Sequence, residues 1–152
     1  MALFLRFCGR WGLGLGLLSA FTGALTPEAF DVREVTIDGV HNALFTHLTT
    51  CRELVSAYIS RIEAFNPTIN AVISLNPEAL SVADELDGRI AAGNVTGSLF
   101  CIPILLKDNF DAVGMNTTGG CLALAGNRPT TDGPVVKAFR EAGAVSQFSM
   151  SL

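Results

Sequence analysis

The chain has 152 residues, a length typical of about one domain. Its formal net charge is −4, its isoelectric point lies near 5.0, and it carries no basic cluster, which excludes a nucleic-acid binder. Hydrophobic residues make up 49% of the chain and its mean hydropathy is +0.44. Part of the chain should therefore lie in a membrane, be removed, or be covered by other protein.

The first 24 residues are typical of a secretory signal peptide. Arg6 and Arg10 supply the positive charge at its start, a long uncharged stretch follows, and Thr22 and Ala24 resemble the small residues of a cleavage site. The alternative is a membrane anchor, because the uncharged stretch approaches the roughly 18 to 20 residues that a spanning helix needs. We expect a secreted chain, with membrane association only if the leader stays uncleaved.

Two short motifs and the cysteine count bear on export. Asn94 and Asn116 each begin an Asn-x-Thr tripeptide, which is the acceptor for N-glycosylation in exported proteins. Once the leader is removed, Cys51, Cys101 and Cys121 remain. An odd number of cysteines without CxxC spacing predicts neither a disulfide framework nor a zinc site.

Residues 25–48 form a lead-in segment whose pattern is too mixed to predict an element. The two histidines of the chain, His41 and His47, both lie in it. They are too few and too poorly spaced for a metal site, and we interpret both as surface or loop residues.

The pattern then becomes regular. A helix is predicted over residues 50–66, because Thr50 and Glu53 have capping-box spacing, apolar residues recur at three- and four-residue steps, and Asn-Pro ends it. Residues 69–75 form a short β-branched run that predicts a buried strand. Residues 76–93 begin with an asparagine cap and a proline and end at a glycine, which predicts a second helix.

The second half continues the alternation. The apolar run over residues 99–106 predicts a strand covered on both faces, with Pro103 at its first residues or at a bulge. A third helix is predicted over residues 134–143, and a further strand begins within residues 144–152. This pattern favours an α/β fold whose sheet is incomplete. The residues expected to face inward on the third helix are Val135, Val136, Phe139 and Ala142.

A lysine stands at the end of the apolar run. Removing Lys107 from water would favour its neutral amine form, which can act as a base, whereas an ordinary strand-end lysine would extend into solvent. Asp108 and Asn109 are expected to hold the following loop. That loop supplies hydroxyl groups and flexible backbone where α/β sheets place ligands, although its glycines also suit simple turns. The substrate-loop candidates are Asp108, Asn109, Thr117, Thr118, Gly119 and Gly120.

These motifs together resemble a known family. The Lys-Asp-Asn element, the Thr-Thr-Gly loop and the Arg-Glu-Ala-Gly-Ala helix of residues 97–145 are similar to the amino-terminal block of the amidase signature family, which hydrolyses carbon–nitrogen amide bonds. Residues 57–87 resemble the family's first helix, strand and second helix. The resemblance implies an α/β fragment of the amidase signature fold, with a mixed, incomplete sheet flanked by helices. It divides the chain into a signal peptide (1–24), a lead-in (25–48) and a partial amidase domain (49–152).

The resemblance also implies a mechanism. A lysine at the position of Lys107 takes a proton from a bridging serine held by a cis peptide bond, and that serine activates a second, nucleophilic serine. Backbone amides of a glycine-rich loop stabilise the oxyanion of the tetrahedral intermediate. The implied partner is a small-molecule amide substrate, and no metal or organic cofactor is implied.

The chain departs from the family at several positions. Both serines belong to glycine-rich motifs further downstream, and neither motif occurs in these 152 residues. Phe100 and Cys101 stand where the family usually has His-Gly, and we interpret Cys101 as a small buried hydrophobe. Ser146, Ser149 and Ser151 lack glycine-rich surroundings and are interpreted as plain strand or tail residues.

Three hypotheses follow from these departures. The first is a truncated and inactive amidase that retains only the lysine of the triad. The second is a non-catalytic partner-binding module or decoy derived from an amidase. The third is a complete amide hydrolase whose remaining segments lie outside these 152 residues.

Overall fold

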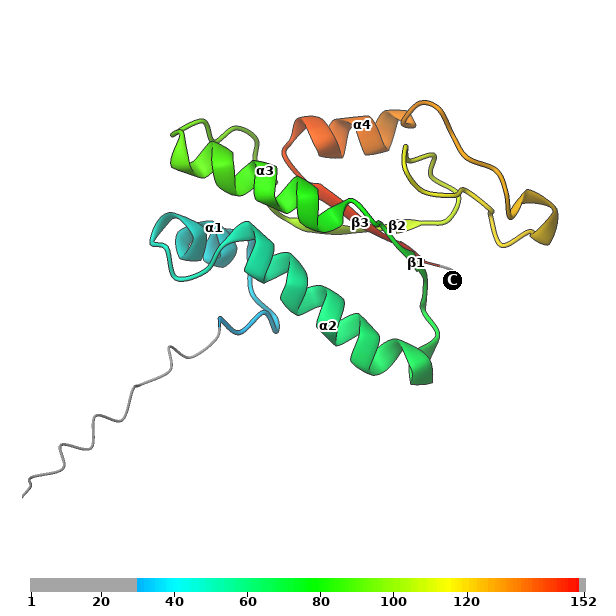
Figure 1. Cartoon of the computed structure of the whole chain (residues 1–152), viewed down its shortest axis with the longest axis horizontal. Coiled ribbons are helices and arrows are strands. Elements are labelled where there is room, and N and C mark those ends of the chain that lie inside the picture. Colours follow the sequence, from blue (N-terminus) through cyan, green and yellow to red (C-terminus); the bar gives the residue numbers. More distant parts are fainter. Residues whose placement is uncertain (1–29, 151–152) are drawn as a thin grey trace, which may run out of the picture.

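The computed structural model describes residues 30–150. The predicted signal peptide therefore lies outside the described residues. Within residues 30–150, no helix has the length and apolar character needed to cross a membrane. Figure 1 shows the elements in chain order, which are α1 (Ile37–Phe45), α2 (Cys51–Ile69), β1 (Val72–Leu75), α3 (Ala79–Ala91), β2 (Pro103–Lys107), the 3-10 helix η1 (Leu122–Leu124), α4 (Pro134–Glu141) and β3 (Val145–Met150).

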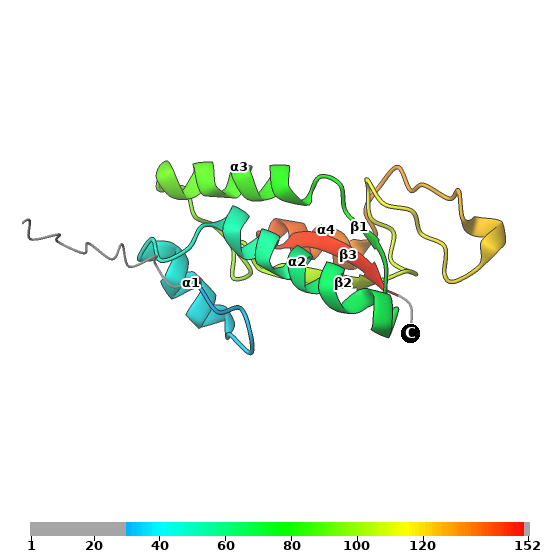
Figure 2. The ribbon, with the colours of Figure 1, turned by 60° about the horizontal axis from the view of Figure 1, so that its bottom comes forward.

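The strands form one mixed sheet. Its order is β1-β3-β2, with β3 antiparallel to β1 and parallel to β2. Helices α3 and α4 contact β3, and α2 packs against α3. Figures 1 and 2 show α2 and α4 on opposite sides of the sheet. The expected α/β arrangement is confirmed, and the strand predicted at the end of the chain is the centre of the sheet.

Helix α2 begins as predicted and ends later than predicted. Thr50 and Glu53 form the capping box. The end expected before Pro67 was wrong, because the helix continues for one more turn and stops at Asn70, whose left-handed φ of 52° breaks it. The Asn66 side chain then exchanges two hydrogen bonds of 2.9 and 2.8 Å with the backbone of Val72. These bonds place the start of β1 at Val72 instead of at residue 69.

Helix α3 also begins slightly later than predicted. The Asn76 side chain accepts a hydrogen bond of 3.0 Å from the backbone N–H of Glu78, and the helix starts at Ala79. Asn76 thus shapes the turn before the helix, as an asparagine-proline start favours, without being the residue that caps it. The helix was predicted to end at Gly93 and ends nearby, at Ala91. Gly93 lies just beyond the helix with a left-handed φ of 70°.

The strands are less covered than their composition predicts. Ile73 is 49% exposed, so the prediction of a buried strand over residues 69–75 was wrong for the described part of the chain. Leu105 is 43% exposed, so the prediction that the strand of residues 99–106 is covered on both faces was also wrong there. Packing explains the difference, because α3 and α4 contact the sheet whereas α2 packs on α3. A cavity of about 590 Å³ therefore lies between α2 and the sheet, lined by Tyr58, Phe65, Ile69, Ile102 and Leu105 among others.

The main apolar core lies at the start of β2. It includes α1, which the mixed pattern of residues 25–48 did not predict and which Thr36 caps by accepting a hydrogen bond from Gly39 N. A second, smaller cluster lies under α4, where Val136 is buried as predicted but Val135 is 44% exposed. The main core contains Val40, Leu44, Cys51, Leu54, Val55, Ala83, Leu86, Phe100, Cys101 and Val145.

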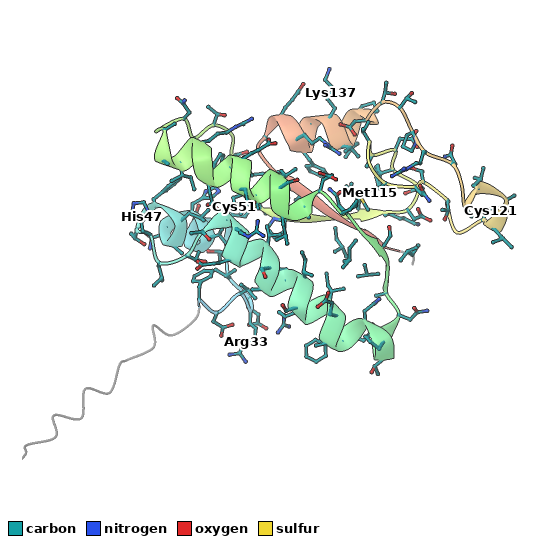
Figure 3. All side chains as sticks on the ribbon, in the orientation of Figure 1. Arg33, His47, Cys51, Met115, Cys121 and Lys137 are labelled. Carbon is teal, nitrogen blue, oxygen red and sulfur yellow. A yellow bond between two sulfur atoms is a disulfide. The ribbon has the colours of Figure 1, made fainter. Side chains whose placement is uncertain are left out.

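Two cysteines that are distant in the sequence are joined in this core. Cys51 and Cys101 form a disulfide across 50 residues, with both side chains fully buried. The cysteine count and spacing predicted no disulfide framework and left the pairing open, because no local spacing connects these two positions. Cys101 is buried as expected, but it is bonded to Cys51 instead of being a free small hydrophobe. Cys121 is exposed and lies at the far end of the loop region in Figure 3.

One histidine is also placed differently from the prediction. His47 is exposed, as expected for a loop residue. His41 is half-buried on α1, and its Nε2 donates a hydrogen bond of 3.0 Å to the carbonyl oxygen of Phe100. His41 therefore fixes α1 to the turn that precedes β2, which is a structural role.

Candidate active site

Lys107 is the last residue of β2. Because β2 and β3 are parallel, their carboxyl ends meet at one edge of the sheet, and the register pairs Lys107 with Met150. Alternation along the strand places Lys107 on the same face as Leu105, and its side chain is exposed. The backbone N–H of Phe110 donates 3.0 Å to the Lys107 carbonyl and closes the turn after the strand. Lys107 thus lies where α/β sheets place ligands.

Asp108 follows Lys107 and is only 4% exposed. Its carboxylate accepts hydrogen bonds from Thr118 N at 2.9 Å, from Gly120 N at 3.2 Å and from the Thr118 hydroxyl. Its carbonyl accepts a hydrogen bond of 2.9 Å from Gly119 N. One buried carboxylate therefore holds the Thr-Gly-Gly loop against the end of β2, as expected for Asp108, while Asn109 is exposed in the turn.

Gly119 and Gly120 adopt a backbone conformation that favours glycine. Gly119 has a φ of 57° and Gly120 a φ of 75°, which is the left-handed region that favours glycine. Thr117 N donates 3.0 Å to the carbonyl of Asn127. The backbone amides of residues 117–120 each donate to an acceptor within the chain, so they do not form an oxyanion hole in this arrangement.

The loop after β2 is also held near Val113, by the charged pair of Asp132 and Arg140, which the sequence analysis did not predict. Asp132 accepts a hydrogen bond of 2.7 Å from Val113 N and lies 3.1 Å from Arg140 Nε. Arg140 also donates 3.0 Å to the Val113 carbonyl. These contacts connect the loop to α4. No local pattern could have identified them, because Val113 is 19 residues from Asp132 and 27 from Arg140.

A second cavity adjoins these residues. Its volume is about 410 Å³, and Asp108, Thr118, Arg128 and Leu75 contribute to its lining. It is smaller than the cavity along α2, but it is the one that borders the loop next to Lys107. Among the residues that the structure describes, no group of three or more His, Cys, Asp or Glu side chains is placed to hold a metal ion.

The two glycosylation candidates lie in different surroundings. Asn94 is exposed in the loop after α3. Asn116 is also exposed, but its Nδ2 donates a hydrogen bond of 2.9 Å to the Ala125 carbonyl. The nitrogen that would carry a glycan is thus already bonded at Asn116. Glycosylation at both positions stays a prediction.

Comparison with solved structures first defines the class of fold. Native peptide amidase from Stenotrophomonas maltophilia superimposes with a TM-score of 0.76 at 38% identity, over 79% of this chain and 25% of that protein. The fold is accordingly that of the amidase signature enzymes, represented by an amino-terminal portion with an incomplete sheet.

Sequence comparison then gives the family. The Amidase family model matches residues 53–148, and the chain belongs to this family. A putative amidase of Schizosaccharomyces pombe is 40% identical over 75% of this chain. A probable amidase of Arabidopsis thaliana is 38% identical over 78% of it. The chain spans only 20% and 24% of the length of these two relatives.

Proposed function

We propose that this chain contributes the lysine base of an amide-hydrolysing site, and that the base is Lys107. The observation that carries the proposal is the position of Lys107, at the carboxyl edge of the parallel β2–β3 pair and directly before the buried Asp108 that holds the loop. Membership of the amidase family supports it. A small-molecule amide is the proposed substrate class.

The reaction requires groups beyond the described residues. Lys107 as a neutral amine would accept a proton from a bridging serine, which would deprotonate the nucleophilic serine as it attacks the amide carbonyl. The amine would leave with a proton, and water would hydrolyse the acyl-enzyme. Lys107 is exposed here, so the desolvation that favours a neutral amine would come from the segments that carry the serines.

These 152 residues would be inactive by themselves. The glycine-rich serine motifs do not occur in them, and the amides of residues 117–120 already donate within the chain. Because the members of such a triad act as a unit, losing two of them removes most of the catalysis. Purified chain incubated with simple amides is expected to release no amine above the buffer rate, and catalysed release would contradict this proposal.

The role of Lys107 can be tested in a complete relative. Residues 50–145 would replace the matching segment of a full-length amidase, and Lys107→Ala would be compared with Lys137→Ala, an exposed lysine on α4. Lys107→Ala is expected to lower kcat/KM at least about a thousandfold, and Lys137→Ala less than about twofold. Activity of Lys107→Ala within tenfold of the parent graft would overturn the proposal.

We also propose that the chain enters the secretory pathway. The leader of residues 1–24, the exposed acceptor Asn94 and the buried Cys51–Cys101 disulfide support this, because disulfides form in oxidising compartments. Sequencing the amino terminus of the chain recovered from a eukaryotic host should find a new terminus near residue 25. A chain that retains Met1 would argue for the anchored alternative.

A further inference from the structure

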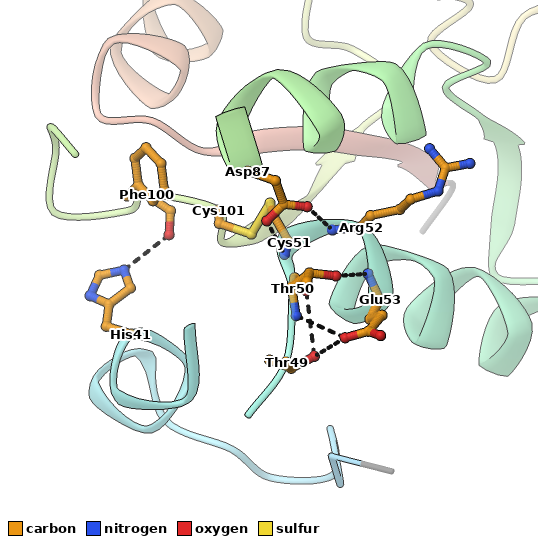
Figure 4. The surroundings of a disulfide bond; sticks show 9 residues. All are labelled: His41, Thr49, Thr50, Cys51, Arg52, Glu53, Asp87, Phe100 and Cys101. Carbon is orange, nitrogen blue, oxygen red and sulfur yellow. Dashed lines mark hydrogen bonds between the residues drawn. A yellow bond between two sulfur atoms is a disulfide. The ribbon is translucent and has the colours of Figure 1, made fainter. Parts of the chain in front are cut away.

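The disulfide lies where several elements converge. Cys51 is the first residue of α2, and Cys101 stands in the turn that leads into β2 (Figure 4). The backbone N–H groups of Cys51 and Arg52 both donate to the Asp87 carboxylate of α3, at 2.7 and 3.0 Å. The disulfide therefore connects the turn before β2 to the first residue of α2. Hydrogen bonds to Asp87 already fix that end of α2 to α3. We call residues 50–52, Asp87 and residues 97–101 the disulfide junction.

Cys101 has an unusual backbone conformation. Its φ of 62° lies in the left-handed region, which costs energy for any residue with a Cβ and favours glycine. The turn is held by backbone bonds from Leu99 N to the Ala142 carbonyl and from Cys101 N to the Gly143 carbonyl, both of 3.0 Å. A cysteine here accepts the backbone cost that a glycine would avoid, and the side chain it adds makes a covalent bond.

The neighbouring residues explain why this turn matters for the strand. Val145 N donates 2.9 Å to the Ile102 carbonyl, so the residue just before β2 is already hydrogen-bonded to the first residue of β3. Cys101 immediately precedes Ile102, and Lys107 ends the same strand six positions after Cys101. The turn at Cys101 is thus adjacent to the hydrogen bond at Ile102 that precedes the pairing of β2 with β3.

We propose that the Cys51–Cys101 bond is a redox-controlled restraint on the start of β2. When the bond is closed, it holds Cys101 in its left-handed conformation. When it is reduced to two thiols, the hydrogen bonds and the burial of Phe100 remain but the covalent restraint is lost, and the start of β2 opens locally more often. The restraint would act on β2 whether or not Lys107 is catalytic.

The chemistry of closure requires a disulfide donor. One cysteine thiolate attacks a sulfur of a low-molecular-weight disulfide such as glutathione disulfide, and a donor thiol leaves. The second thiolate displaces the remaining donor thiol from the mixed disulfide. Two cysteine thiols lose two protons and two electrons, and the donor disulfide becomes two thiols. Since both cysteines are fully buried, the closed bond is reachable by a reductant only after local opening.

Hydrogen exchange measured by mass spectrometry tests the proposal on the full chain. Cys51→Ala should speed amide exchange at least tenfold in residues 99–105, and less than twofold in residues 137–140 of α4. Adding Cys101→Gly to this variant should restore part of the protection, because glycine accepts the left-handed turn without a Cβ. Cys121→Ser, which changes an exposed cysteine, is the matched control and should leave exchange unchanged.

Several results would overturn the proposal. Peptide mapping of the oxidised chain that finds Cys51 and Cys101 unlinked would refute it, and so would unchanged protection of residues 99–105 in Cys51→Ala. Equal acceleration in α4 would show a general loss of fold instead of a local restraint. If Cys51→Ala does not fold, the oxidised chain treated with increasing reductant gives the same comparison, and faster exchange confined to residues 99–105 and the start of α2 would support the restraint.

Discussion

The two ends of β2 are held in different ways. At its start, the disulfide junction is buried in the main apolar core, with Phe100 and Cys101 fully excluded from solvent. At its end, Lys107 is exposed, and the following loop is held by hydrogen bonds to Asp108. We call residues 107–120 the lysine edge. The described residues thus bury the start of the strand and leave its end, where the proposed base Lys107 lies, exposed to solvent.

The two ends of β2 are stabilised by different kinds of contact. Burial of apolar surface and a covalent bond hold the start in addition to its hydrogen bonds. At the lysine edge, the loop is held by directional hydrogen bonds to Asp108, of which each contributes about 1 kcal/mol net. We expect local opening to be more frequent at the lysine edge than at the disulfide junction.

The largest expected effect comes from comparing one phenylalanine at each end. Phe100 is fully buried and Phe110 is 37% exposed. Phe100→Ala should lower the free energy of unfolding by about 3 to 5 kcal/mol, because it leaves a cavity in the main core. Phe110→Ala should lower it by less than about 1.5 kcal/mol, because the ring already contacts water. Urea unfolding of both variants measures the contrast, and similar losses at the two ends would refute it.

A smaller effect is expected from weakening the lysine edge. Asp108→Asn replaces a carboxylate that accepts from Thr118 and Gly120 with a neutral amide of the same shape. It should cost about 1 to 3 kcal/mol, because buried donors lose a charged acceptor. Amide exchange at Gly119 and Gly120 should accelerate, while residues 99–101 stay protected.

The matched control for this change is Asp111→Asn. Asp111 is exposed, and its contact with Gly133 is made by its backbone carbonyl, which the substitution keeps. It should change the free energy of unfolding by less than about 0.5 kcal/mol. Equal exchange rates at Gly119 in the Asp108→Asn and parent chains would show that the loop is held by other groups.

The lysine edge was predictable from sequence because its parts are close in the chain. The apolar run of β2, the lysine at its end and the glycine loop about ten residues later are local patterns, and Asp108 was expected to hold that loop. The capping box of α2 is equally local, with Thr50 and Glu53 three residues apart. The resemblance to the amidase signature family supplied the role proposed for Lys107.

The disulfide junction was not predictable because its parts are distant. Cys51 and Cys101 are separated by 50 residues. Asp87 accepts hydrogen bonds from the backbone N–H groups of Cys51 and Arg52, which lie 36 and 35 residues before it. The number of cysteines alone does not indicate which pair forms a disulfide. Helix α1 was missed for a related reason, because its short mixed pattern becomes helical where Val40 and Leu44 pack into a core formed by later elements.

The smallest effect concerns Tyr58, which stabilises the lead-in beside the cavity along α2. Its hydroxyl donates 3.0 Å to the Val32 carbonyl, and partial burial raises the pKa of the phenol above its usual value of 10.0, while the nearby Arg61 guanidinium opposes the shift. Because the folded chain holds this proton more tightly than the unfolded chain, its contribution to stability is complete below pH 10 and is lost as the pH rises through the folded pKa.

Tyr58 is the only tyrosine in the chain, so the ultraviolet absorbance of tyrosinate reports its titration alone. The folded chain should titrate above the denatured chain, and Arg61→Gln should raise the folded pKa further, because it removes the opposing positive charge. Tyr58→Phe should cost about 1 kcal/mol at neutral pH and flatten the loss of stability above about pH 10. Coincident titration of folded and denatured chains would mean that the phenol is solvated and that the lead-in is not fixed to α2 through this bond.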